Sequence, residues 1–170
     1  DALTKGAKRY GHKLISASAS EGTLGREHLF ELLELVDQSD YVYILETNGM
    51  TLGNDPEFAQ QLSRVKNLHV RVSIKGTHED EFHELTSAIP SSYQLPFKAL
   101  KYLIDAKVSC NACVMVSFSD KAGIQQVEDR LYKVYPGLLK SLEKEHITPF
   151  PKVAKRLAKN GLKPNSIAFK

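Results

Sequence analysis

Residues 41–49 read "YVYILETNG", an apolar run followed at once by a carboxylate, a hydroxyl, an amide and a glycine. Residues 70–77, "VRVSIKGT", repeat this arrangement with Ser73, Lys75 and Gly76. Apolar runs rich in β-branched and aromatic residues that end at turn-forming residues are typical of buried strands. The two stretches therefore predict adjacent strands whose ends carry polar groups.

Outward from these stretches, short apolar runs alternate with amphipathic helical patterns. Asp55 and Pro56 are typical of a helix start, as N-cap and first helical residue, and Gly161 is typical of a helix end. Repeated strand–helix units predict right-handed crossovers and a parallel sheet with helices outside. Strands are expected at 12–18, 40–47, 68–75 and 108–119, with a fifth candidate at 165–169. Helices are expected within 26–39, 54–67, 78–88, 91–107, 121–135, 136–146 and 151–163.

The length and composition suit one domain, 1–170, large enough for a real core. Of the 170 residues, 42% are hydrophobic and 25% charged, and the formal net charge of +3 does not by itself indicate nucleic acid binding. No apolar stretch is long enough to span a bilayer and no signal peptide is recognisable. We expect a cytoplasmic protein without a membrane partner, and nucleic acid is not expected as a partner.

The two cysteines, Cys110 and Cys113, lie inside an apolar run that predicts a strand. Residues three apart in a strand point to opposite faces, so the two sulfurs are expected to diverge. Without a second cysteine pair, a zinc site is not expected. We expect two small strand residues and no metal site.

Polar or glycine-rich stretches follow three of the expected strands, at 18–23, 46–49 and 73–77. In parallel sheets, ligands bind at the carboxyl ends of strands. Glu46 could accept hydrogen bonds from a ribose, Lys75 could bind a carboxylate, and Glu21 could receive an ammonium group. With Asn48 and Ser73, these residues predict a site for a small ligand that carries a ribose, a carboxylate and an amine. Each residue taken singly also fits an ordinary surface or turn position.

The stretches "YILETNG", "VRVSIKGTHEDEFHELTS", "LPFKALKYLIDAKVS" and "VMVSFS" resemble the radical S-adenosylmethionine superfamily, in particular archaeal-type members related to the glycyl-radical-enzyme activating enzymes. The resemblance implies an incomplete TIM-type α/β barrel, here of four to five strands with outer helices. It implies that Glu46 lies near the ribose of S-adenosylmethionine and Lys75 near its carboxylate. Glu21 matches the acid of the family motif that holds the methionyl amine. Ser73 matches a polar position on the same strand as Lys75.

The chain departs from the family at two places. It contains no CxxxCxxC motif, so it lacks the cysteine ligands of the family's [4Fe–4S] cluster. Ala19 and Ser20 replace two glycines of the amine-binding motif, and Gly22 replaces its proline. We therefore expect a core fragment of an enzyme that cleaves S-adenosylmethionine to a 5′-deoxyadenosyl radical, not catalytically competent as it stands and with no catalytic residue assigned. The alternative is a degenerate, non-catalytic module that binds a nucleotide or a protein.

The segment 151–163 predicts a basic amphipathic helix whose cations lie beside Val153, Leu157 and Leu162. Such a helix could meet RNA, an acidic protein or a membrane surface, or simply cover the sheet with its cations outward. An incomplete barrel also leaves an open sheet edge, through which self-association is possible. The sequence does not indicate the substrate.

Overall fold

The five strands lie in the sheet in the order in which they occur in the chain, β1-β2-β3-β4-β5, in the computed structural model, which describes residues 13–17 and 21–168. The pairs β1–β2, β2–β3 and β4–β5 are parallel. The strands are β1 (Leu14–Ser16), β2 (Val42–Thr47), β3 (Leu68–Lys75), β4 (Cys110–Met115) and β5 (Glu143–Glu145).

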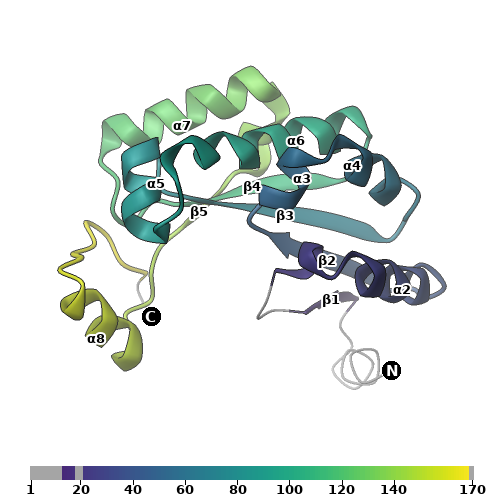
Figure 1. The fold of residues 1–170 in the computed structure, drawn as a ribbon, viewed down its shortest axis with the longest axis horizontal. Coiled ribbons are helices and arrows are strands. Elements are labelled where there is room, and N and C mark those ends of the chain that lie inside the picture. Colours follow the sequence, from purple (N-terminus) through teal and green to yellow (C-terminus); the bar gives the residue numbers. More distant parts are fainter. Residues whose placement is uncertain (1–12, 18–20, 169–170) are drawn as a thin grey trace. The chain divides into compact units, whose positions relative to one another are not determined.

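Helices connect the strands, as parallel neighbours require. They are α2 (Arg26–Asp37), α3 (Met50–Asn54), α4 (Pro56–Leu62), α5 (Glu79–Thr86), α6 (Leu95–Asp105), α7 (Lys121–Val134) and α8 (Pro151–Lys159), with 3₁₀ turns at Gly22–Leu24, Pro90–Gln94 and Pro136–Ser141. The predicted fold class, an α/β partial TIM-type barrel with a parallel sheet and outer helices, is confirmed (Figure 1).

Contacts along the chain form two compact units. Unit 1 consists of Asp1–Ser73 and Gln94–Asn111, and unit 2 of Ile74–Tyr93 and Ala112–Lys170. The single domain 1–170 expected from the sequence stays a prediction.

The core of unit 1 follows from the alternation along β2 and β3. Tyr43 and Leu45 of β2 and Val70 and Val72 of β3 are buried on one face, while the residues between them are partly exposed. The helices α3, α4 and α6 lie together on one side of β3 (Figure 1). The buried residue Gly53 allows this packing, because an added Cβ would lie 2.2 Å from the carbonyl oxygen of Leu95 at the start of α6.

Arg26 joins α2 to α4 through three kinds of contact. Its Nη1 donates to Asp55 Oδ2 at 2.7 Å, its Nε and Nη2 donate to Gln61 Oε1 at 3.2 and 2.9 Å, and its guanidinium lies 4.2 Å from the centre of the Phe58 ring. Asp55 is also the N-cap of α4, as predicted, with Oδ1 accepting from the N–H of Phe58 at 3.1 Å. The hydrogen bond from Arg26 is the main cause that lowers the pKa of Asp55.

This lowered pKa predicts how stability depends on pH. A carboxyl group whose pKa is lower in the folded state stabilises the fold above its unfolded pKa and loses that contribution as pH falls through the folded pKa. Asp55→Asn should therefore cost stability at neutral pH, and the difference from the wild type should disappear well below the unfolded pKa near 3.8. Because both partners are about one-third exposed, the loss should stay below about 1 kcal/mol.

The measurement is urea unfolding of both proteins at neutral and at acidic pH. Asp40→Asn is the matched control, because Asp40 is exposed and forms no ion pair with a described residue. A stability difference for Asp55→Asn that persisted unchanged in acid would contradict the assignment.

In unit 2, α5, α7 and the 3₁₀ turn Pro136–Ser141 each pack side chains into the core, among them Phe82, Leu131 and Leu138. Two expectations were wrong here. Residues 136–146 do not form a helix: Pro136 and Gly137 begin a short 3₁₀ turn, and Glu143–Glu145 is the fifth strand. Of the strand expected at 165–169, the described residues 165–168 form none, since Ile167 makes only an isolated bridge with Ile147.

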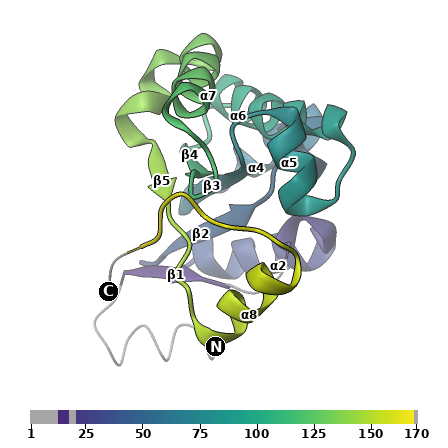
Figure 2. The ribbon, with the colours of Figure 1, turned by 90° about the vertical axis from the view of Figure 1, so that its left-hand side faces the viewer.

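The segment that carries α8 begins just after β5, and its end forms hydrogen bonds with residues that follow β4 and β5. The N–H of Ala168 donates to Ile147 O at 3.0 Å, and the N–H of Asn165 donates to Ser117 O at 2.6 Å (Figure 2). Figure 1 shows α8 away from α5 and α7 of its own unit, and none of its residues is buried. Among residues 13–17 and 21–168, no helix is long and apolar enough to cross a membrane.

Candidate functional site

The Glu21 carboxylate ties the segment after β1 to the carboxyl end of β2. Oε1 accepts from the hydroxyls of Thr23 and Thr47 at 2.6 and 2.7 Å, and Oε2 accepts from the N–H of Asn48 at 2.7 Å. The N–H of Thr23 donates a fourth, longer bond of 3.4 Å. A carboxylate has about four acceptor sites. Three of these bonds share Oε1 and one uses Oε2, so Oε2 keeps one acceptor site. Binding of a ligand amine by Glu21 stays a prediction, and Ala19 and Ser20 lie outside the described residues.

Glu46 lies on the partly exposed face of β2 and forms an ion pair with Arg71, its register partner on β3. The pair uses Oε1 of Glu46; Oε2 accepts no hydrogen bond from the part of the chain that the structure describes. The side chain is 42% exposed. Because Arg71 fixes the carboxylate through one oxygen, the other can accept hydrogen bonds from a ligand hydroxyl.

Ser73 and Asn48 lie at the same strand ends. Ser73 follows Arg71 by two residues on the same face of β3, is partly exposed, and its hydroxyl forms no hydrogen bond with a described residue. The exposed Asn48 accepts from the N–H of Met50 through Oδ1 at 2.9 Å, just before α3. Unit 1 therefore brings Glu46, Asn48 and Ser73 to the carboxyl ends of two paired strands.

Lys75 belongs to unit 2. Its Nζ lies 3.6 Å from Oε2 of Glu145 on β5, and both side chains are about one-third exposed, at 40% and 32%. Its charge is thus balanced within unit 2 by Glu145, for which the sequence pattern predicts a helix. That Lys75 acts together with Glu46 stays a prediction.

The cysteines do not suit an iron–sulfur cluster. Cys113 is buried and Cys110 is partly buried, on the opposite face of β4. Desolvation raises the pKa of Cys110 to about 11, which favours the neutral thiol over the thiolate that binds metals. No group of three or more histidine, cysteine or acidic residues within 13–17 and 21–168 could hold a metal ion.

Sequence reasoning missed the role of Glu81, which is only 7% exposed in unit 2. Its Oε2 accepts from the N–H and the hydroxyl of Thr77 at 2.6 and 2.8 Å, and the Ser119 hydroxyl lies 2.8 Å from Oε1 and 2.9 Å from Oε2. Glu81 thereby links the loops after β3 and β4. The sequence showed it only as one of three acids in the first turn of a helix. A cavity of about 350 Å³ opens beside it, lined also by His78, Asp80, Glu84, Phe118, Asp120 and Asn165.

Comparison with solved structures extends the fold assignment. The crystal structure of Streptococcus suis SuiB bound to S-adenosylmethionine aligns with a TM-score of 0.64 and 15% identity, covering 99% of this chain and 42% of SuiB. Native anSMEcpe with bound AdoMet aligns with a TM-score of 0.53 and 19% identity, covering 89% of this chain and 48% of that protein. The chain has the radical S-adenosylmethionine fold.

The chain spans less than half the length of either solved structure, so these likenesses establish the fold alone. A histidine-tagged form of anSMEcpe with bound AdoMet gives a similar result, with a TM-score of 0.52, 17% identity, and coverage of 91% of this chain and 46% of that one. No protein-family model and no curated protein matches the sequence.

Proposed function

We propose that the chain binds S-adenosylmethionine at the carboxyl ends of β2 and β3, with Glu46 accepting hydrogen bonds from the ribose hydroxyls. The observation that carries this proposal is the Glu46–Arg71 pair, which fixes the carboxylate and leaves Oε2 for a ligand. Ser73, next along the same face of β3, offers a hydroxyl to the same ligand. The fold shared with proteins solved with bound S-adenosylmethionine supports this choice of ligand.

The methionyl end of the ligand fits less well. Glu21 already accepts four hydrogen bonds from the protein, so the ribose contributes more to affinity than the amine does in this proposal. That Lys75 meets the methionyl carboxylate stays a prediction from the sequence, and within unit 2 its charge already faces Glu145.

The [4Fe–4S] cluster that the resemblance implies would supply the electron that cleaves S-adenosylmethionine. The two cysteines of this chain do not fit it, one being buried and the other kept in its neutral form. We therefore propose that these 170 residues bind the nucleoside without cleaving it. The parent protein is a radical enzyme if other residues supply the cluster ligands. Otherwise the chain is a non-catalytic nucleotide-binding module, which the altered amine-binding motif at Ala19 and Ser20 favours.

Isothermal titration calorimetry with S-adenosylmethionine tests the proposal. Glu46→Ala should weaken binding about tenfold or more, because a hydrogen bond to a charged acceptor contributes about 1.5–3 kcal/mol. Ser73→Ala should have a smaller effect, and adenosine should compete with S-adenosylmethionine, since the ribose is the recognised part.

Glu27→Ala is the control, because Glu27 is an exposed acid on α2. Equal affinity of the wild type and Glu46→Ala, both well folded, would refute the ribose contact. Anaerobic reconstitution with iron and sulfide should give no iron–sulfur absorption; a stable chromophore would show that the chain does hold a cluster.

A further inference from the structure

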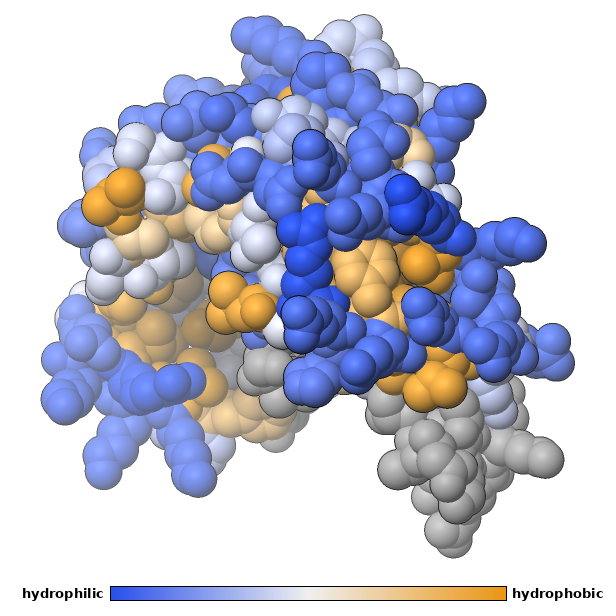
Figure 3. Space-filling model, turned by 45° about the vertical axis from the view of Figure 1, so that its right-hand side comes forward, coloured by the Kyte–Doolittle hydropathy of each residue, from blue (hydrophilic) through white to orange (hydrophobic). Residues whose placement is uncertain are grey.

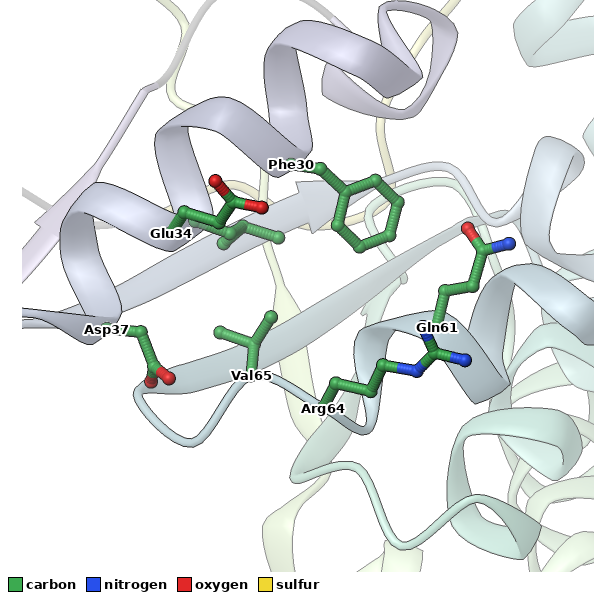
Figure 4. Close-up of a pocket in the computed structure, with 7 residues that line it drawn as sticks. Phe30, Glu34, Asp37, Gln61, Arg64 and Val65 are labelled. Atoms are coloured by element: carbon green, nitrogen blue, oxygen red, sulfur yellow. The ribbon is translucent and has the colours of Figure 1, made fainter.

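A second pocket lies entirely within unit 1, between α2 and the end of α4 (Figure 4). Its volume of about 290 Å³ is at the small end of the range of ligand pockets. Phe30, Leu33 and Val65 form an apolar surface in it. Figure 3 shows a hydrophobic patch enclosed by hydrophilic side chains in the part of the surface formed by α2 and α4.

Charged groups of opposite sign flank this apolar surface. Glu34 and Asp37 of α2 lie on one side, and Arg64 and Gln61 on the other (Figure 4). Neither Glu34 nor Arg64 forms an ion pair with a described residue. Their charges are thus separated across the pocket and are not neutralised by each other.

Two polar side chains of the pocket are held in place from outside it. Gln61 Oε1 accepts from Nε and Nη2 of Arg26, which turns its amide donors away from Arg26. Asp37 Oδ1 accepts from the N–H groups of Lys66 and Asn67 at 2.9 and 3.0 Å, so the second oxygen remains for a ligand. Preorganisation of this kind lowers the entropic cost of binding.

We propose that this pocket binds a zwitterionic dipeptide with apolar side chains. The ammonium group lies toward Glu34 and Asp37, the carboxylate toward Arg64, and the side chains against Phe30, whose ring packs on Phe58 at 5.9 Å between centres. An extended dipeptide carries its two charges at opposite ends, as the pocket has its acids and Arg64 on different sides (Figure 4), whereas the charges of a free amino acid are adjacent. The side chains that form this pocket differ from those proposed for S-adenosylmethionine. Failure of one ligand to bind would therefore not decide whether the other binds.

Two-dimensional amide NMR of the folded chain, titrated with dileucine, tests this proposal. Shifts should concentrate in α2 and around residues 61–67, with an affinity in the millimolar range, as expected for a small, open pocket. Dileucine with acetylated and amidated ends keeps the side chains but loses both charges. This blocked peptide should bind at least about fivefold more weakly. A fivefold change in Kd corresponds to a loss of only about 1 kcal/mol of binding free energy.

Arg64→Ala should weaken dileucine binding at least about fivefold and leave the binding of the blocked peptide unchanged. Glu34→Gln should act in the same direction, and Arg156→Ala, an exposed cation on α8, is the control that should change nothing. Equal binding of free and blocked dileucine would overturn the charge recognition. Absence of localised shifts at about 10 mM dileucine would overturn the site itself.

Discussion

Gly53→Ala should destabilise the fold by about 3 kcal/mol, at the upper end of the cost of overpacking a core. An added Cβ would lie 2.2, 2.8 and 2.9 Å from the O, C and Cα atoms of Leu95. These are backbone atoms at the start of α6 and cannot turn aside as a flexible side chain can. Relief therefore requires α3 and α6 to move apart, which opens the core of unit 1. Urea unfolding followed by circular dichroism measures the loss.

The control is Gly25→Ala. An added Cβ at Gly25 meets nothing within 4 Å, and its φ of −98° suits any residue. This variant should match the wild type or exceed its stability slightly, because alanine restricts the unfolded chain. A Gly53→Ala protein as stable as Gly25→Ala would show that α3 and α6 are not in close contact.

Glu81→Ala should cost about 2–4 kcal/mol, since it leaves the Thr77 N–H and the hydroxyls of Thr77 and Ser119 without their acceptor. All three groups bond to one buried carboxylate that links the loops after β3 and β4. Thr77 also packs closely against α7, because an added Cβ on Gly123 would lie 2.4 Å from its hydroxyl. The loss should therefore extend to amide hydrogen exchange in α7.

Glu81→Gln separates hydrogen bonding from charge. Its carbonyl oxygen can accept from Thr77, and its amide can donate to the Ser119 hydroxyl, which can rotate to accept. We expect Glu81→Gln to lose less than half as much stability as Glu81→Ala. Equal losses would show that the negative charge, and not the set of acceptors, stabilises the two loops.

Much of the fold followed from local patterns. Asp55 and Pro56 begin α4 because the aspartate side chain caps the helix and proline needs no N–H there, and both effects act within one turn. The apolar runs at β2 and β3 predicted strands, and their side chains alternate between buried and partly exposed positions. Such features are readable because they depend on neighbours in the chain.

The fifth strand could not be predicted from local sequence patterns. Glu143–Glu145 contains only charged residues and lies at the sheet edge, where pairing with β4 decides its conformation. The hydrophobic pattern of 165–169 suggested a strand, but Ile167 is exposed and forms only a bridge. Long-range pairing overrides local propensity at such positions.

The sequence predicted which polar residues lie at the strand ends, but not which side chains they would pair with. The polar residues do gather at strand ends, as parallel strands require, but no local pattern indicated that Arg71 would pair with Glu46 or that Glu145 would pair with Lys75. Nor could such a pattern show that Glu21 would accept hydrogen bonds from Thr23, Thr47 and Asn48. Ion pairs and hydrogen bonds between segments far apart in the chain depend on register, which one sequence does not reveal.

The bridge between Ile147 and Ile167 has a consequence for how this chain can vary. Residues between the two bridged positions form a loop that carries α8. The ends of this loop are bonded to each other and to Ser117. Lengthening such a loop costs little, since each doubling of a loop adds only about 0.6 kcal/mol of closure entropy. The α8 region is therefore the place where insertions, fused peptides or reporter sequences can be accommodated while the strands that carry the candidate site keep their pairing.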